Sequence, residues 1–353
     1  MVGAPSNDGD TFRAKRHPGF TCGGTMSLRI AVIGAGVHGE RYARHIAEDV
    51  DGLELVAVCR RDRTACQAMA ARWSVEPVTD ATALIASGTI DAVVIATPPS
   101  SHFPLAKAAL EAGLAVLLEK PMTGTLAEAQ QLEAIERRCD APPLMLAQTL
   151  RWNPVLARVR EILPSLGAIR YMRISQRLEP TSLPWQQDPA QTVGGSVLLT
   201  GVHLIDTLRF LSGEEFHMVD CRLEQFRNPA VEDFFHAHAR LTDGAHASLE
   251  VSKFGRARGC LIEAVGDEGQ VVAEYYSGGI RVNRGSETAV EDLNAAVPTL
   301  PAMLTDWRNA VLNKTTPPVV ITDGVKIMEV VAACYKSARS GQPMVVGEST
   351  SGG

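Results

Sequence analysis

Between residues 28 and 148 the chain alternates short apolar runs with amphipathic segments, and this alternation predicts an α/β domain. The apolar runs are rich in β-branched residues, which is typical of buried strands, and they cover 28–33, 53–59, 91–96, 115–118 and 144–148. Helical patterns are expected at 37–49, 62–73 and 125–138. Because strands alternate with helices, the sheet is expected to be parallel and doubly wound, with right-handed crossovers.

After residue 149 the pattern changes, and it predicts a second α/β domain. Expected helices at 154–163 and 195–211 enclose an expected strand at 168–178. Strands dominate from 216 to 282, with Asp243 and Gly244 at the turn of a hairpin. Further helices are expected at 302–313 and 323–340. The apolar spacing of the last helix indicates that it packs back on the structure as core, with the first domain as a candidate surface.

A glycine-rich turn follows the first expected strand. Gly34, Gly36 and Gly39 have the G-x-G-x-x-G spacing, and a helical pattern begins at once with Val37 and His38. The first glycine permits a tight turn, the second lets the backbone approach a pyrophosphate, and the third lets helix and strand pack closely. The helix N-terminus also favours a bound anion. The turn therefore predicts dinucleotide binding.

Two arginines end the second expected strand, where dinucleotide folds usually carry an acidic residue for the ribose 2′-hydroxyl. Arg60 and Arg61 suit a 2′-phosphate, because guanidinium groups form bidentate charge-assisted bonds with phosphate. NADP is therefore the preferred cofactor. NAD remains the alternative, because Asp62 can still reach a hydroxyl.

Two later strands end at the same edge of the predicted sheet, where ligands bind in open α/β folds. The loop T-P-P-S-S-H supplies Thr97, Pro98 and His102 as candidate cofactor neighbours, with a structural role at the helix start as the alternative for His102. The next strand runs directly into Glu119 and Lys120, ahead of a proline. Glu119 and Lys120 at this edge are candidates for cofactor contact, and the lysine is also a candidate for chemistry.

Composition narrows the class of protein. The 353 residues are 45% hydrophobic and carry a net charge of −6 without a basic run, which argues against nucleic acid as a partner. No apolar run reaches the ~18 residues that a membrane helix needs. The cysteines lack any C-x-x-C pair, which fits a reducing cytoplasm better than a disulfide framework. The seven cysteines are Cys22, Cys59, Cys66, Cys139, Cys221, Cys260 and Cys334.

These patterns divide the chain into four parts. Residues 1–25 are poor in core-forming side chains and are expected to be a flexible extension, with Met26 as an alternative start. Residues 26–148 form the expected dinucleotide-binding domain, 149–346 the second domain, and 347–353 a tail. A chain of this length is expected to hold two domains.

The motifs G-A-G-V-H-G, A-T-P-P-S-S-H and L-E-K-P, in this order, resemble those of the Gfo/Idh/MocA oxidoreductase family. The later segments at 194–206 and 323–338 agree, so the resemblance covers roughly residues 27 to 346. It implies a Rossmann domain followed by an α/β domain with a large, open, mainly antiparallel sheet. That sheet is expected to join copies into a homodimer or homotetramer, and the substrate is expected to be a sugar or polyol.

The resemblance also implies site residues. Lys120 and His203 correspond to the catalytic or substrate-binding lysine and histidine of the family, with Lys120 as the acid–base group for hydride transfer. Many family members carry an Asp, or another polar residue, where this chain has Leu199. Catalysis by Lys120 and His203 alone stays possible, but the departure favours the alternative of a cofactor-binding sensor without turnover. A third, less favoured alternative is a redox-assisted glycosidase, which some relatives are.

Three further residues are candidates for binding the substrate. Arg151 is suited to a hydroxyl or carboxylate, with a domain-interface ion pair as an equal alternative. Asp206 shares an expected helix face with His203, and Trp185 lies in the preceding loop. His236 and His238 share one face of an expected strand, but they lack a third ligand at a near spacing, so no metal site is predicted.

Overall fold

The computed structural model describes residues 27–138, 142–181 and 183–347. The expected extension 1–25 lies outside these residues, as does the tail beyond Gly347.

The first domain contains a six-stranded parallel sheet with the order β3-β2-β1-β4-β5-β6. Its strands are β1 (Leu28–Ile33), β2 (Leu53–Cys59), β3 (Glu76–Val78), β4 (Ala92–Ile95), β5 (Ala115–Leu118) and β6 (Met145–Leu146). This is the doubly wound order of dinucleotide-binding folds, in which the direction of winding reverses between β1 and β4. The residues of β1, β4 and β5 are almost all buried, which explains their continuous apolar runs.

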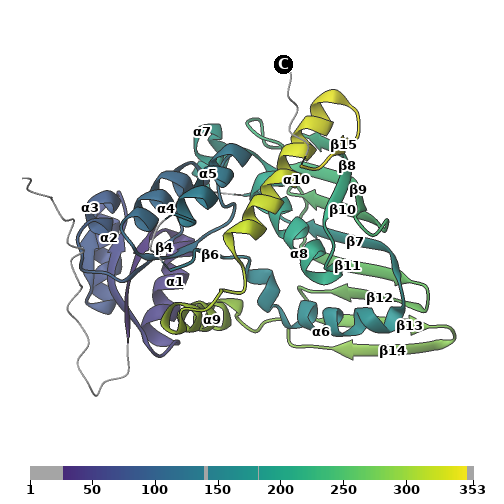
Figure 1. Ribbon diagram of the computed structural model, residues 1–353, viewed down its shortest axis with the longest axis horizontal. Coiled ribbons are helices and arrows are strands. Elements are labelled where there is room, and N and C mark those ends of the chain that lie inside the picture. The colour runs from purple at the N-terminus through teal and green to yellow at the C-terminus, as the bar shows by residue number, and fades with distance from the viewer. Residues whose placement is uncertain (1–26, 139–141, 182, 348–353) are drawn as a thin grey trace, which may run out of the picture.

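Helices cover both faces of this sheet (Figure 1). They are α1 (Val37–Glu48), α2 (Arg63–Trp73), α3 (Ala81–Ile85), α4 (His102–Glu111) and α5 (Leu126–Glu136). Side chains cap several of them: Asp62 accepts from Ala65 N, and Thr125 and Glu128 form a capping box at α5. Sequence patterns therefore located the helices well, although β3 and α3 were too short to be expected.

The second domain is a nine-stranded sheet in the order β14-β13-β12-β11-β7-β10-β9-β8-β15. Neighbouring strands are antiparallel except for β7 and β10. The strands are β7 (Ile169–Arg177), β8 (Phe216–Glu224), β9 (Phe234–Leu241), β10 (His246–Ser252), β11 (Gly259–Gly266), β12 (Gly269–Glu274), β13 (Gly279–Arg284), β14 (Glu287–Asp292) and β15 (Met344–Val345). The mixed α/β architecture with a large, mainly antiparallel sheet is the one that the sequence predicted.

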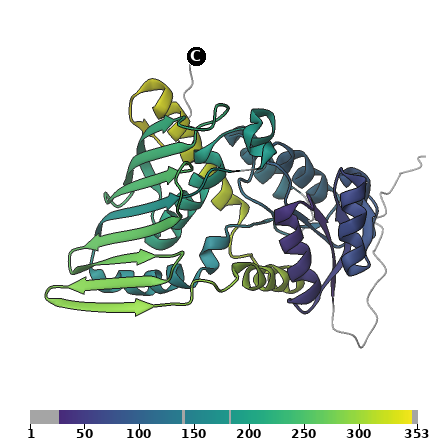
Figure 2. The ribbon, with the colours of Figure 1, turned by 180° about the vertical axis from the view of Figure 1, so that it is seen from behind.

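Helices pack on one face of this sheet, and Figure 2 shows the other face, which they leave uncovered. The helices of this part of the chain are α6 (Pro154–Ile162), α7 (Pro189–Thr192), α8 (Val202–Ser212), α9 (Thr299–Asn313) and α10 (Ile321–Ser340). The alternation along β9 follows from this arrangement, because Phe235, Ala237 and Ala239 are buried while His238 and Arg240 are exposed.

The end of the chain joins the two domains. Helix α10 contacts both α5 of the first domain and β8 of the second, and it crosses between them in Figure 1. Helix α9 packs on α1, and its buried Trp307 and Met303 belong to the same core cluster as β1. Residues assigned by sequence to the second domain thus complete the core of the first.

The expected helix at 195–211 is not uniformly α-helical. Residues Val197–Gly201 form a π-helical turn, and α8 begins only at Val202. The wider turn shifts Leu199 relative to His203, whereas His203 and Asp206 both lie within α8. A Cβ on Gly201 would lie 3.2 Å from the ring of Phe235, so this turn packs closely on the sheet.

Candidate active site

The glycine turn has the geometry of a phosphate cradle. Gly34 adopts φ +91°, and a Cβ there would lie 2.6 Å from the backbone of Ala96. A Cβ on Gly39 would clash with the carbonyl oxygen of Gly34. At Gly36, by contrast, a Cβ would meet nothing within 4 Å. The first and third glycines are therefore required by the fold, whereas the second leaves open space in front of the backbone.

This open space fits a dinucleotide. It lies at the N-terminus of α1, where Gly36 provides no side-chain cap and Val37 is 74% exposed. The loop after β4 faces the same turn, and the buried Thr97 hydroxyl has no hydrogen-bond partner among the described residues. Unpaired backbone donors and an orphaned hydroxyl are groups that a bound pyrophosphate cofactor can satisfy.

Glu119 joins the loop after β5 to helix α1. Its Oε1 accepts from the Tyr42 hydroxyl at 2.6 Å and contacts His38 Nε2 at 2.6 Å, while Oε2 accepts from Lys120 N at 3.0 Å. Burial alone would raise the pKa of Glu119, but His38, the Lys120 charge and the Tyr42 hydroxyl outweigh it and hold that pKa well below its usual range. Glu119 is 5% exposed, and both of its carboxylate oxygens have hydrogen-bond partners. The side chain therefore holds the loop after β5 against the helix that follows the glycine turn.

Lys120 lies where the two domains meet. Its Nζ donates to the carbonyl oxygen of Leu199 at 2.9 Å, and a cis peptide links it to Pro121. Burial lowers the pKa of Lys120, and the nearby Glu119 carboxylate only partly opposes that effect. A desolvated amine with a lowered pKa can exchange a proton more readily than a surface lysine.

His203 on α8 lies near this amine. Its Nδ1 is 3.1 Å from Gln148 Oε1, an acceptor, which fixes the neutral tautomer with hydrogen on Nδ1 and a lone pair on Nε2. Burial lowers the pKa of His203 to about 3, and the positive charge of Lys120 acts in the same direction. His203 is therefore a neutral ring that can accept a hydrogen bond through Nε2.

His102 has a structural position. It is 1% exposed, with Nδ1 2.6 Å from the Pro121 oxygen and Nε2 2.8 Å from the Thr97 oxygen. Both ring nitrogens are occupied by the backbone of the two loops at the sheet edge. His102 therefore has the structural role that was considered as its alternative. Its ring joins the two loops that carry Thr97 and Lys120.

The arginines after β2 lie beside the glycine turn. Arg60 Nη1 donates to the carbonyl oxygen of Ala35 at 3.3 Å, and Arg61 is exposed. Asp62 accepts from Ala65 N at 3.0 Å as the N-cap of α2, so the carboxylate considered for a ribose hydroxyl has a structural partner.

Arg151 and Asp206 form the interface ion pair that was one of the two expectations for Arg151. The guanidinium donates through Nε and Nη2 to the two oxygens of Asp206, at 3.0 and 2.6 Å. It also donates to the Pro318 oxygen and lies 3.4 Å from Asp323 of α10. Asp206 is only 1% exposed, so the structure shows the ion-pair role for both side chains, and substrate binding by either one stays a prediction.

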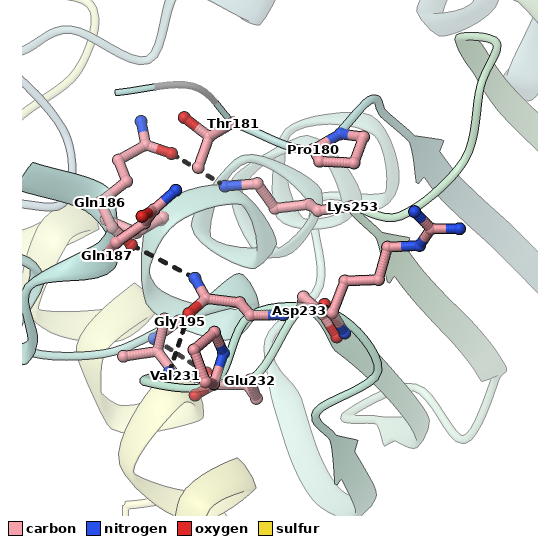
Figure 3. Close-up of a pocket in the computed structure, with 13 residues that line it drawn as sticks. Pro180, Thr181, Gln186, Gln187, Gly195, Val231, Glu232, Asp233 and Lys253 are labelled. Carbon is pink, nitrogen blue, oxygen red and sulfur yellow. Dashed lines mark hydrogen bonds between the residues drawn. The ribbon is translucent and has the colours of Figure 1, made fainter. Parts of the chain in front are cut away.

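A pocket of about 260 Å³ opens in the second domain (Figure 3). Leu199, whose carbonyl binds Lys120, is part of its wall, and Gln186 and Lys253 are the polar side chains that meet within it. Trp185 belongs to the same turn (Pro184–Gln187), but the lining comes from Gln186 and Gln187 instead. Lys253 was not expected from the sequence, because it follows β10 without a motif around it.

The two strand histidines have local partners. His236 Nε2 lies 3.2 Å from the Ser248 hydroxyl, and His238 stacks on His246 with ring centroids 5.1 Å apart. Among the residues that the structure describes, no group of three or more candidate ligands is placed to hold a metal ion. Within the same residues, no helix is long and apolar enough to span a membrane.

Comparison with known proteins gives consistent results. Residues 28–145 match the family model of oxidoreductases with an NAD-binding Rossmann fold, and residues 157–272 match the C-terminal domain model of the same family. A D-apiose dehydrogenase from Paraburkholderia graminis is 28% identical over 88% of this chain and 88% of its own length. An inositol 2-dehydrogenase from Rubrobacter xylanophilus is 28% identical over 92% of this chain and 94% of its own length.

A solved structure has the same fold. The oxidoreductase domain protein from Kribbella flavida superimposes with a TM-score of 0.83 at 24% identity, covering 92% of this chain and all of that one. Together with the two family models, which cover both domains, these matches show that the chain belongs to the Gfo/Idh/MocA family of oxidoreductases, whose N-terminal domain is an NAD-binding Rossmann fold.

Proposed function

We propose that this protein transfers a hydride between a nicotinamide dinucleotide and a hydroxyl-bearing carbon of a sugar or polyol. The observation that carries the proposal is the position of Lys120. Its Nζ is bound to the Leu199 carbonyl at the pocket, while its backbone is tied through Glu119 to the helix of the glycine turn. A desolvated amine thus lies between the expected cofactor site and a sugar-sized pocket.

In this proposal, the cofactor, Lys120, His203 and Gly36 have separate roles. The cofactor, when bound at the glycine turn, supplies the carbon that accepts or donates the hydride. Lys120 takes the hydroxyl proton at Nζ during oxidation and returns it during reduction, which its lowered pKa favours. His203 accepts a hydrogen bond at Nε2 from the substrate and orients the reacting carbon. Gly36 leaves room for the pyrophosphate.

Leu199 is the residue that favoured a sensor without turnover. In the structure its main-chain carbonyl is the partner of Lys120, so the lysine has a fixed acceptor although the side chain at this position is apolar. This contact supports the catalytic proposal over the sensor. The relatives named as D-apiose and inositol dehydrogenases support the choice of sugars and polyols as the substrate class.

For the cofactor, we infer that NADP is preferred over NAD. Arg60 lies close to the glycine turn, Arg61 is exposed beside it, and Asp62 caps α2. Two guanidinium groups without an available carboxylate favour a 2′-phosphate.

A substrate panel tests the function. Sugars, polyols and sugar acids are incubated with the protein and either NAD⁺ or NADP⁺, and formation of reduced nicotinamide is followed by its ultraviolet absorbance. Turnover with at least one compound is expected, and Lys120→Met should slow it strongly. Cofactor binding without turnover across the panel would favour the sensor, and cleavage of glycosides without added cofactor would favour the glycosidase.

The proposal also covers the oligomeric state of the protein and the compartment in which it works. The uncovered face of the nine-stranded sheet supports self-association into a dimer or tetramer, which native mass measurement tests (Figure 2). Cys59, Cys66, Cys221, Cys260 and Cys334 are free and buried, which supports a reducing compartment such as the cytoplasm.

A further inference from the structure

Lys253 contributes a cation to the pocket beside Lys120. It follows β10, and its Nζ donates to Gln186 Oε1 at 3.2 Å (Figure 3). Gln186 is in turn fixed by its backbone oxygen, which accepts from the Asn228 side chain at 3.3 Å. The only described hydrogen bond of the ammonium is therefore to a neutral amide oxygen, which leaves two of its three N–H groups for a ligand.

The acidic residues of the pocket are committed elsewhere. Asp233 accepts from the backbone N–H groups of Phe226, Arg227 and Asn228 at 2.7 to 2.9 Å. Glu232 accepts from the Tyr335 hydroxyl at 2.8 Å and from Gly195 N at 3.0 Å. Glu232 and Asp233 lie near enough to Lys253 to raise its pKa, but they offset burial only in part, and among the described residues no carboxylate forms a direct ion pair with it. A desolvated cation without an ion pair is costly, unless an anion from outside completes the site.

Lys253 and Lys120 both lie close to Leu199 and the pocket that it lines. Leu199 lines the pocket and accepts from Lys120, and the charge of Lys120 adds to burial in lowering the pKa of Lys253 to about 8. Lys253 is therefore still mainly charged near neutral pH. Arg227, an exposed side chain on the pocket wall, adds a second positive group at the mouth.

We propose that Lys253 binds the substrate directly and selects sugars that carry an anionic group, a carboxylate or a phosphate, over the corresponding neutral sugars. The anion would pair with the Lys253 ammonium while a hydroxyl of the same molecule reaches Lys120. The volume of about 260 Å³ lies just below the ~300–1,000 Å³ typical of ligand sites, which suits a ligand no larger than one monosaccharide. This inference rests on the proposed function, because it takes the pocket as the sugar site.

The test compares sugars that differ at one carbon only. D-glucose, D-glucuronate and D-glucose 6-phosphate, with the matching galactose series, are measured for kcat/KM with the preferred cofactor and for binding by calorimetry. Wild type is expected to favour one anionic series over the neutral one, and the two anionic arms identify the group. Lys253→Met should lower kcat/KM for that series about 10- to 100-fold, as for loss of one charge-assisted bond, and should lower it by a clearly smaller factor for the neutral sugars.

Two control variants make the result specific. Lys253→Arg keeps the charge and should retain most of the anion preference. Lys107→Met removes an exposed lysine of α4 and should change neither series. An equal loss for neutral and anionic sugars in Lys253→Met, or a wild-type preference for neutral sugars, would overturn the inference.

Binding separates this inference from the proposed function. If calorimetry shows anion-selective binding that Lys253→Met abolishes, but no reduced nicotinamide forms, the selectivity of Lys253 stands and the hydride-transfer proposal fails. If turnover occurs on neutral sugars alone, the hydride-transfer proposal stands and the role of Lys253 fails.

Discussion

The two lysines of the site come from different domains and are held in different ways. Lys120 is tied at its backbone to Glu119, a carboxylate with all its oxygens engaged and a direct link to helix α1. Lys253 lies at a strand end without a motif, where its backbone N–H donates to the Asp233 carbonyl oxygen at 2.9 Å and its ammonium donates to the Gln186 side chain. If the proposed function holds, the proton-transfer lysine is fixed next to a fully bonded carboxylate, whereas the proposed substrate lysine keeps N–H groups free for a ligand.

The largest expected effect sharpens this contrast. Lys120→Met should lower kcat by roughly 10²- to 10⁴-fold, because it removes the positioned proton acceptor. Lys253→Met should instead act on selectivity. Steady-state kinetics on an active substrate, with cofactor binding measured separately, checks the difference. A Lys120→Met enzyme with nearly normal kcat would remove Lys120 from the proton path.

The glycine turn offers a second test, within the cofactor side itself. Gly36→Val places its side chain in open space, so the fold should persist while cofactor affinity falls about 10- to 100-fold, as expected for overpacking of a binding site. Gly34→Val is the matched control, since φ +91° and the Ala96 backbone make it a destabilising change. Fluorescence titration and thermal unfolding separate the two outcomes. Unchanged cofactor affinity in a folded Gly36→Val protein would place the pyrophosphate elsewhere.

The pH dependence of the unfolding free energy tests whether His203 is neutral in the folded protein. The pKa of His203 is lowered to about 3 in the folded protein, so between pH 3 and the usual value of 6.5 the unfolded chain binds a proton that the folded protein does not. Stability should therefore rise with pH across this window. His203→Gln should reduce that slope by up to ~1.4 kcal/mol per pH unit. Urea unfolding between pH 5 and 6.5 checks this, above the pH at which Glu119 would contribute. An unchanged slope would mean that His203 is charged in the folded state.

The smallest expected effect concerns cofactor choice. Arg60→Asp should shift the ratio of the KM values for NADP and NAD by about tenfold towards NAD, because it replaces a phosphate partner with a repelling charge. Arg63→Asp, a change at the first residue of the next helix, is the control for general loss of positive charge. An unaltered ratio in Arg60→Asp would show that the guanidinium bound to the Ala35 carbonyl does not reach the ribose.

Much of the proposed cofactor site could be predicted from sequence, because its residues belong to short motifs of neighbouring positions. The spacing of Gly34, Gly36 and Gly39 dictates a turn, and a strand that runs into Glu119 and Lys120 must place both at the same sheet edge. What sequence could not show was the partner of each group. Glu119 was expected to contact the cofactor, and only the fold reveals that it binds His38 and Tyr42 from α1.

The substrate side was harder because its contacts join distant segments. Arg151 and Asp206 are 55 residues apart, and only the fold shows the ion pair that was one of the two roles considered for Arg151. Leu199 lies in the π-helical turn before α8, and it contacts Lys120 through its main-chain carbonyl instead of its side chain. Lys253 and Gln186 are 67 residues apart and have no spacing pattern, so only the folded pocket identifies them.

The central claim is tested most directly by following the hydrogen itself. With a substrate found in the panel and labelled with deuterium at the oxidised carbon, the reduced cofactor is isolated and its mass is measured. The account predicts that one deuterium appears on the nicotinamide ring in wild type and that Lys120→Met forms the same labelled product far more slowly. Product formation without deuterium on the cofactor would contradict hydride transfer at this site.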